Sequence, residues 1–238
     1  MKNFIKKKLI SIFQFIEYNF SMKASHKSPV DFYLDEVSQN SYQFFKEHIK
    51  KSSVFLKDDD IRHYSISKSF NNISNKNNIF IEFGVYKGDS IKLFAKFLSK
   101  NNLEIFGFDS FEGLEEDWIV NDYNPTGTFA LKNKKLKIPK NVNIIKGKVQ
   151  DTLGDFLNQN NEKKITFAHM DMDTYTPTKY ALTQIKPFLQ KGSVILFDEL
   201  YGFPSWENHE YKALKEVFND KEYKYLAFGK RQASIEIL

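Results

Sequence analysis

Short apolar runs alternate with amphipathic segments from residue 79 onwards. The apolar runs have the length and composition of buried strands, and they lie at 79–81, 105–108, 142–145, 165–170 and 194–197. The segments between them repeat apolar residues at helical spacing, at 89–99, 152–157, 178–189 and 207–218. Two further apolar runs, 223–228 and 232–237, flank Gly229 and Lys230 and predict a closing hairpin.

This alternation predicts the fold class. Strands that alternate with helices form a mostly parallel sheet with helices on both faces, and a C-terminal hairpin adds an antiparallel edge. We therefore expect an α/β, Rossmann-like, doubly wound fold with a seven-stranded, mostly parallel sheet, preceded by N-terminal helices. Gly192 is expected to close the helix 178–189, and Ser205 is expected to cap the helix 207–218.

The first 70 residues predict a helical extension or cap, followed by the main domain at 71–238. Residues 31–51 repeat apolar residues at helical spacing, 57–60 are expected to begin an exposed helix, and 71–78 form a polar loop. Residues 1–20 predict an amphipathic helix, with Ile5, Leu9, Ile12, Phe13, Ile16 and Phe20 on one face. We expect this helix to pack on the domain or on a second copy, with weak membrane-surface contact as the alternative.

Composition narrows the classes of function. The chain has no Cys, which excludes disulfides, thiolate nucleophiles and Cys-ligated zinc. Its net charge is +5, mostly from Lys and without an arginine-rich stripe, so we expect no nucleic-acid partner. No apolar run reaches the ~18 residues of a spanning helix, and Gln14 and Glu17 interrupt any signal-peptide core. We expect a cytoplasmic protein, or in the membrane-contact alternative one peripheral to the inner membrane face.

Acidic residues follow four of the five apolar runs, at Glu82, Asp109, Asp171 and Asp198. Ligands bind beyond the carboxyl ends of strands in such sheets. After the first run, Gly84 and Gly88 let the backbone approach a ligand closely, but the third glycine of the dinucleotide fingerprint is missing. Glu82 would repel a pyrophosphate and suits a cationic ligand with an amino acid end, which disfavours a nicotinamide cofactor.

The second acid extends this ligand hypothesis. Asp109 stands where a carboxylate accepts both ribose hydroxyls, and Phe111 is placed to stack beside an adenine. A metal site is the second hypothesis. Asp171, Asp198 and Glu199 follow neighbouring strands, and negative charges held so near to one another need a cation or protons to offset their repulsion. Oxygen ligands suit Mg²⁺ or Ca²⁺ over zinc. The alternative is that these acids cap the following helices.

Five segments together resemble the macrocin O-methyltransferase (TylF-like) family, and they lie at 82–90, 107–114, 147–153, 169–175 and 197–202. The resemblance covers about Ile79 to Leu238. It implies S-adenosylmethionine as methyl donor, a divalent cation, usually magnesium, and a hydroxyl acceptor, often on a sugar. Besides Glu82, Gly84, Gly88 and Asp109, we expect the donor to contact further residues in these segments, namely Tyr86, Ser90, Ser110, Phe111, Gln150, Asp151 and Asp171.

The expected reaction is methylation of a hydroxyl on a sugar, a glycosylated metabolite or a surface glycan. A bound metal lowers the hydroxyl's pKa, and Asp173 is the candidate base. His169 is either a neighbour of the metal ligands or a buried core histidine, which we favour. The rival hypotheses are a metal-independent N- or C-methyltransferase and a non-catalytic module of the same fold.

Three surface features remain open from the sequence. Trp206 and Tyr201 either line a sugar pocket or pack in the core. The long segment 118–140 either acts as a lid or forms a solvated basic loop. Self-association is expected as a further option, with the N-terminal helix as one means.

Overall fold

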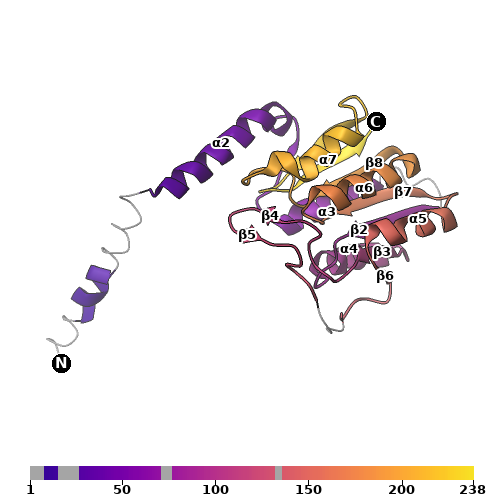
Figure 1. Cartoon of the computed structure of the whole chain (residues 1–238), viewed down its shortest axis with the longest axis horizontal. Helices are drawn as coiled ribbons and strands as arrows, with labels where there is room; N and C mark the ends of the chain where they lie inside the picture. The colour runs from indigo at the N-terminus through magenta and orange to yellow at the C-terminus, as the bar shows by residue number, and fades with distance from the viewer. Residues whose placement is uncertain (1–7, 16–26, 71–76, 132–135) are drawn as a thin grey trace.

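A doubly wound sheet forms the centre of this computed structural model, which describes residues 8–15, 27–70, 77–131 and 136–238 (Figure 1). The main sheet has eight strands in the order β1-β9-β10-β8-β7-β2-β3-β6. Their bounds are β1 Ser53–Val54, β2 Asn78–Phe83, β3 Ile105–Asp109, β6 Val142–Lys146, β7 Lys164–Met170, β8 Leu189–Phe197, β9 Tyr223–Phe228 and β10 Ala233–Ile237. Only β10 runs antiparallel to its neighbours, so the expected fold class is confirmed.

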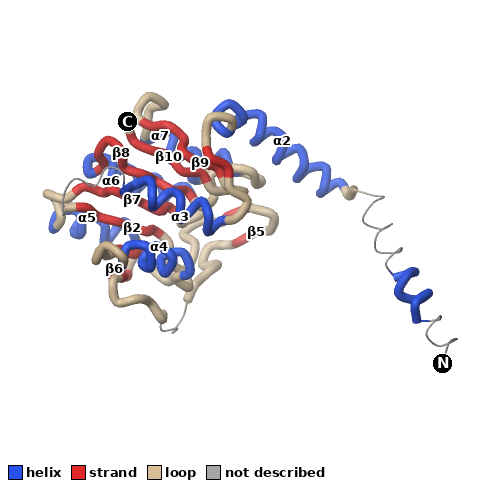
Figure 2. The backbone as a smooth tube through the Cα atoms, turned by 180° about the vertical axis from the view of Figure 1, so that it is seen from behind, coloured by secondary structure: helices blue, strands red, loops and turns tan. Residues whose placement is uncertain are grey.

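Helices cover both faces of the sheet (Figure 2). Alternate residues of a strand point to opposite sides, and the strands carry apolar side chains on both sides that the helices bury. Phe80 of β2 packs with the helices α3 (Asp58–Ser69) and α4 (Asp89–Ser99). Ile79 and Ile81 face the other core, which also contains apolar residues of the remaining helices, α2 Pro29–Ile49, α5 Val149–Gln159, α6 Tyr175–Ile185 and α7 Glu210–Val217. The carboxyl ends of the parallel strands therefore meet at one open rim.

Several local expectations were wrong. The sheet has eight strands instead of seven, because the two-residue β1 pairs in parallel with Ala227 and Phe228 of β9. Gly192 lies inside β8 and does not close a helix, since α6 ends at Ile185. Ser205 does not cap a helix with its side chain; its hydroxyl donates to the carbonyl of Ile119, 2.9 Å away.

The segment 118–140 holds a small hairpin of its own. Strands β4 (Trp118–Ile119) and β5 (Tyr123–Asn124) pair antiparallel. Asp117 fixes this hairpin by accepting from the backbone N–H of Thr126, 2.8 Å away, and from the Tyr123 hydroxyl. The short helices η2 (Lys186–Phe188) and η3 (Trp206–Asn208) complete the elements of the main domain. The described part of the segment therefore contains regular secondary structure, and its role as a lid or as a solvated surface loop stays a prediction.

The N-terminal region divides into two parts. Residues 8–15 are helical and every one is exposed, so this stretch does not form the expected packed cap. The rest of the expected helix 1–20, and residues 71–76 of the expected polar loop, lie outside the described residues. By contrast, Phe45 of α2 and Ile61 of α3 are fully buried in the two cores. The expected division at residue 70 therefore does not separate two cores.

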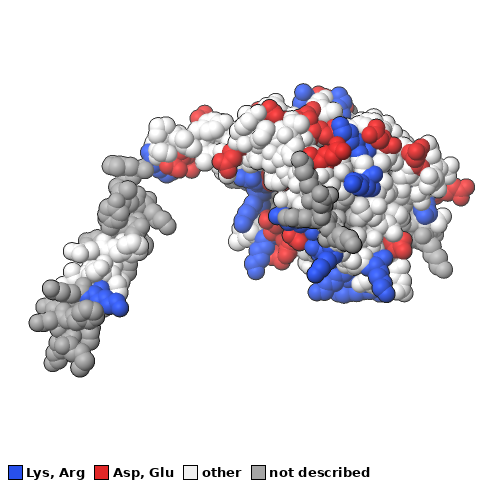
Figure 3. All heavy atoms as spheres, turned by 60° about the horizontal axis from the view of Figure 1, so that its bottom comes forward, with Lys and Arg blue, Asp and Glu red and all other residues white. Residues whose placement is uncertain are grey.

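The face of the domain seen in Figure 3 carries side chains of both charge signs. No helix among the described residues is long and apolar enough to span a membrane.

Candidate functional site

A cavity of about 280 Å³ opens at the rim where the parallel strands end. The loops that follow β2, β3, β6, β7 and β8 all contribute to its wall, together with the segment around β4. Its lining residues are Gly84, Tyr86, Phe108, Asp109, Ser110, Gly113, Leu114, Glu115, Trp118, Phe129, Gly147, Lys148, Val149, Asp171, Met172, Asp173, Pro177 and Glu199. The sequence placed a ligand site at this rim, and the cavity lies there.

The loop after β2 is shaped by its glycines. Gly84 has a φ of +85°, and a Cβ there would lie 1.7 Å from the carbonyl oxygen of Asp171. Gly88 has a φ of +78° and precedes the first turn of α4. Both values belong to the left-handed region that glycine enters without strain. Glycine at position 84 is thus required for β2 and β7 to end side by side.

Asp109 at the end of β3 ties this loop to its neighbour. Its Oδ2 accepts from the backbone N–H groups of Val85 (2.8 Å) and Tyr86 (2.7 Å). Its Oδ1 accepts from the N–H of Phe111 at 2.6 Å. Both lone pairs of Oδ2 are thus used, whereas Oδ1 keeps one lone pair for a ligand hydroxyl. The carboxylate therefore orders the loop and still faces the cavity.

The expected donor contacts fall into two groups. Gly84, Tyr86, Asp109, Ser110 and Asp171 line the cavity. The others lie around it: Glu82, Gly88, Ser90, Phe111, Gln150 and Asp151 are absent from its wall. Their contact with a donor stays a prediction.

Three residues of the second group are occupied by other contacts. The buried Ser90 hydroxyl donates to Oε1 of the equally buried Glu82. Gln150 donates to Glu115, which does line the cavity, at 2.8 Å. Glu82, Ser90 and Gln150 thus support the wall from behind.

Asp171, Asp173 and Glu199 bring three carboxyl groups to the cavity wall. Burial, with the charge of Asp198, raises the pKa of Asp173 to about 7. Burial also raises the pKa of Glu199 to about 8 and that of Asp171 well above its usual range. Oε2 of Glu199 is buried without a hydrogen-bond partner, and its Oε1 lies 3.6 Å from Arg231. When all three carboxyl groups are ionised, their negative charge exceeds the positive charge of the nearby cations.

Asp198 is held differently, because three donors converge on its Oδ1. Arg62 of α3 donates from Nη2 at 2.8 Å, His169 lies 3.3 Å away, and Gln232 also donates. Burial opposes ionisation, but the hydrogen bond and charge of His169 and the charge of Arg62 lower the pKa of Asp198 below its usual range. Asp198 is consequently an anion with one oxygen, Oδ2, left for another partner.

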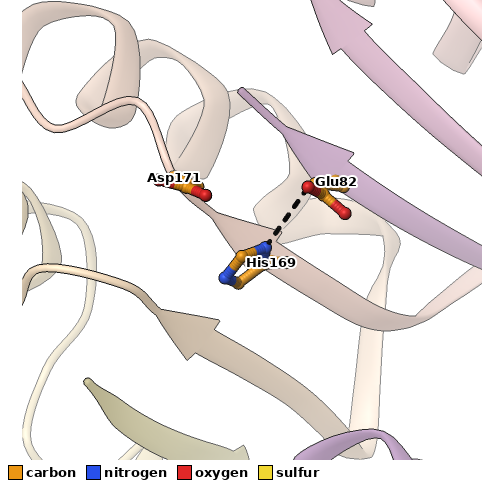
Figure 4. Close-up of side chains that lie close together, drawn as sticks. All are labelled: Glu82, His169 and Asp171. Carbon is orange, nitrogen blue, oxygen red and sulfur yellow. Dashed lines mark ion pairs between the residues drawn. The ribbon is translucent and has the colours of Figure 1, made fainter. Parts of the chain in front are cut away.

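His169 is fully buried between two carboxylates, as expected for a core histidine. Its Nδ1 lies 3.7 Å from Oε1 of Glu82 (Figure 4). Its Nε2 lies 3.3 Å from Oδ1 of Asp198. Burial favours the neutral ring, but the hydrogen bond to Asp198 and the negative charge of Glu82 prevail and raise the pKa of His169 to about 9. An imidazolium therefore bridges β2 and β8 beneath the cavity.

Two sets of residues fit a divalent cation to different degrees. Ligand atoms of Glu82, His169 and Asp171 lie within 4.8 Å of one another, and among the described residues no other group of three meets this distance, so the expected set of Asp171, Asp198 and Glu199 is not brought together as closely. There the charged His169 already balances the carboxylates. The expected set of Asp171, Asp198 and Glu199 offers oxygen ligands and, at Glu199, a buried oxygen without a partner. The donor chemistry of this second set fits Mg²⁺ better.

Sequence reasoning missed the residues that support these acids. Glu210 at the start of α7 is fully buried, and its Oε2 accepts from the Glu199 backbone N–H at 3.1 Å. Arg62 and Gln232 lie outside the segments that carried the resemblance. A buried acid at position 210 and an arginine at position 62 leave no periodic signal. Only their contacts reveal them.

The two aromatic residues expected at a sugar pocket pack in the core. Trp206 is buried against Phe44, Phe45 and Tyr211, and the Tyr201 hydroxyl donates to the carbonyl of Gly229. Other aromatic residues, Tyr86, Trp118 and Phe129, line the cavity instead. Packing was the alternative interpretation for Trp206 and Tyr201, and it is confirmed.

A family model described as a methyltransferase domain matches residues 81–200, half of the chain. The chain belongs to this methyltransferase domain family. The matched range holds the carboxyl end of every strand whose end contributes to the cavity wall. The narrower macrocin family stays a prediction. No curated protein matches this methyltransferase-family chain in sequence.

Solved structures share its fold. The calicheamicin methyltransferase CalS11 is 23% identical with a TM-score of 0.61, over 89% of this chain and 94% of that one. The O-methyltransferase NovP is 16% identical with a TM-score of 0.58, over 75% and 78%. Both likenesses place this methyltransferase-family chain among α/β methyltransferase folds.

Proposed function

We propose that this chain transfers a methyl group from S-adenosylmethionine to a hydroxyl group of a sugar or glycosylated metabolite, aided by a divalent cation. The observation that carries the proposal is one cavity that combines the Gly84–Asp109 rim with the carboxyl groups of Asp171, Asp173 and Glu199. In a second solved structure, an apo form, CalS11 is described as a TDP-rhamnose 3'-O-methyltransferase. This description supports a sugar as the acceptor.

The donor suits the electrostatics of the cavity. Its sulfonium is positive, and five of the lining side chains are carboxyl groups, against one lysine: Asp109, Glu115, Asp171, Asp173 and Glu199, with Lys148. Asp109 would accept the ribose hydroxyls, and Gly84 lets the backbone approach the amino acid end. A pyrophosphate cofactor would meet repulsion in the same place.

Acid–base chemistry is assigned to Asp173. Burial holds its pKa near 7, so the group changes protonation in the range where a general base works best. Its carboxylate takes the acceptor's O–H proton while the new O–CH₃ bond forms and the S–CH₃ bond of the donor breaks. Asp171, Glu199 and the free Oδ2 of Asp198 would hold the cation. When bound, that cation lowers the pKa of the acceptor hydroxyl.

One observation favours a second candidate function. Oδ1 of Asp198 already accepts from Arg62, His169 and Gln232, which leaves fewer oxygens for a metal than the sequence implied. A metal-independent transfer to nitrogen or carbon needs no such site. Turnover that survives a chelator would favour this alternative.

Calorimetric titration with S-adenosylhomocysteine, with and without Mg²⁺, tests the proposal. We expect the product to bind in both cases and Mg²⁺ to bind separately. Absence of product binding would remove the methyltransferase assignment, while product binding without any Mg²⁺ binding would leave the metal-independent alternative.

A further inference from the structure

The helix at residues 8–15 exposes large apolar side chains to solvent. Five of its residues are apolar, and their exposed fractions run from 48% to 73%: Leu9, Ile10, Ile12, Phe13 and Phe15. In Figure 1 this helix stands apart from the domain. Large exposed apolar surfaces of this kind mark contact sites.

The spacing of the apolar residues defines one face. At 100° per residue, Leu9, Ile12 and Phe13 fall on one side of the helix, and Ser11 falls on the other. The sequence repeats the same spacing on both sides, with Ile5, Ile16 and Phe20, which lie outside the described residues. A face of this length is available to a flat partner.

Charge identifies the partner. Residues 1–20 contain four lysines, Lys2, Lys6, Lys7 and Lys8, against one acid, Glu17. The sign changes at α2, whose first turns carry Asp31, Asp35 and Glu36. Amphipathic helices flanked by lysines bind the interface of anionic bilayers. Two copies of the segment placed together would instead bring their lysines into repulsion.

We infer that the helix at residues 8–15 attaches this protein to an anionic lipid surface, with Leu9, Ile12 and Phe13 inserted among the lipids and Lys8 at the headgroups. Attachment does not depend on the proposed methyl transfer. The acidic start of α2 limits the contact to this segment and leaves the cavity of the domain free of it.

Co-sedimentation of the full chain with vesicles tests the inference. Vesicles of phosphatidylcholine with phosphatidylglycerol are compared with vesicles of phosphatidylcholine alone, at low and high salt. The Ile12→Asp variant removes one inserted side chain, and Ser11→Asp adds the same charge on the opposite face as the matched control. We expect I12D to bind the anionic vesicles at least about tenfold more weakly than S11D, from the lost burial of one isoleucine.

The wild-type chain is expected to prefer the anionic vesicles and to leave them as salt rises. The affinity for S-adenosylhomocysteine and the circular dichroism spectrum should be the same in I12D, in S11D and in the wild-type chain. Equal binding by I12D and S11D, or absence of wild-type binding to anionic vesicles, would overturn the inference. So would a wild-type oligomer, measured by light scattering, that I12D alone dissociates, because a second copy would then be the occupant.

Discussion

Gly84 is the residue whose identity the backbone dictates most strictly. Its left-handed φ and the 1.7 Å that would separate a Cβ from the Asp171 carbonyl leave no room for a side chain. The same glycine lines the cavity. One atom added there would push apart the two strand ends that carry the site.

Gly84→Ala is therefore expected to lower the free energy of unfolding by roughly 2–4 kcal/mol, from overpacking and a strained φ, and to abolish product binding. Gly154→Ala is the matched control, because a Cβ at this position of α5 meets nothing within 4 Å. That variant should gain up to about 1 kcal/mol from helix propensity. Urea unfolding measures both; a G84A protein as stable as wild type would contradict the close approach.

Asp173 is the second residue with a sharp expectation. Asp173→Asn keeps the shape and removes the base, so turnover should fall by at least about 100-fold while the affinity for S-adenosylhomocysteine stays within about twofold. Asp155→Asn, on the exposed side of α5, is the control and should leave turnover unchanged. Loss of Mg²⁺ binding in D173N would instead make Asp173 a metal ligand.

The sequence predicted the residues that follow strand ends, and it could do so because strand ends are visible in the hydrophobic pattern. Asp109, Asp171 and Asp173 all line the cavity as a result. It could not predict Arg62 or Glu210. Their roles depend on contacts between elements far apart in the chain, such as the 2.8 Å bond from Arg62 to Asp198.

At the scale of elements, α3 is joined to β8 by this same contact. The Arg62 side chain is 18% exposed and that of Asp198 is 17% exposed, so the pair is largely shielded from water. A second ion pair of Arg62, to Asp59 at 3.5 Å, lies at the surface. The two pairs on one arginine allow a matched comparison.

Arg62→Met is expected to cost about 2–3 kcal/mol of unfolding free energy, because it leaves a buried carboxylate with fewer donors. The value lies at the low end for a buried pair, since His169 and Gln232 still donate to Asp198. Asp59→Asn should change stability by less than about 0.5 kcal/mol. Chemical denaturation measures both, and equal effects of the two variants would show that the α3–β8 contact is unimportant.

Element boundaries were predictable only where periodicity and termination signals agree. Helix α4 and strand β3 lie where expected. Helix α5 begins at Val149, three residues before its expected start, because apolar spacing alone does not mark a first turn. The two-residue β1 is too short to show any alternation; its pairing with β9 is a tertiary effect.

At the scale of the whole molecule, buried acids make stability depend on pH. The pKa values of Asp173 and Glu199 are raised to about 7 and about 8, from 3.8 and 4.5. At a pH between the ordinary and the raised pKa of each group, the folded chain keeps a proton that the unfolded chain has lost. The free energy of unfolding therefore falls as the pH rises through this range. His169 acts in the same direction, because the stability from its pKa, raised from 6.5 to about 9, is lost as pH rises through that range.

We therefore expect the metal-free protein to melt at a lower temperature at about pH 8.5 than at about pH 5.5. Mg²⁺ should raise the melting temperature more at the higher pH, because a cation binds the ionised acids. Differential scanning fluorimetry with and without a chelator measures both effects. A melting temperature independent of pH would contradict the burial of these acids in an uncompensated cluster.

The strand order has a consequence for biosynthesis. Strand β10 lies between β8 and β9, and β1 rests on β9. Neither β1 nor β9 can join the rest of the sheet until residues 233–237 have left the ribosome. Helix α3 also packs on β7 and β8, which pair without β10, so only its contacts with β9 must wait for this strand. Nascent chains stalled before residue 233 should thus expose the edge of β8 and recruit chaperones that bind unpaired strands.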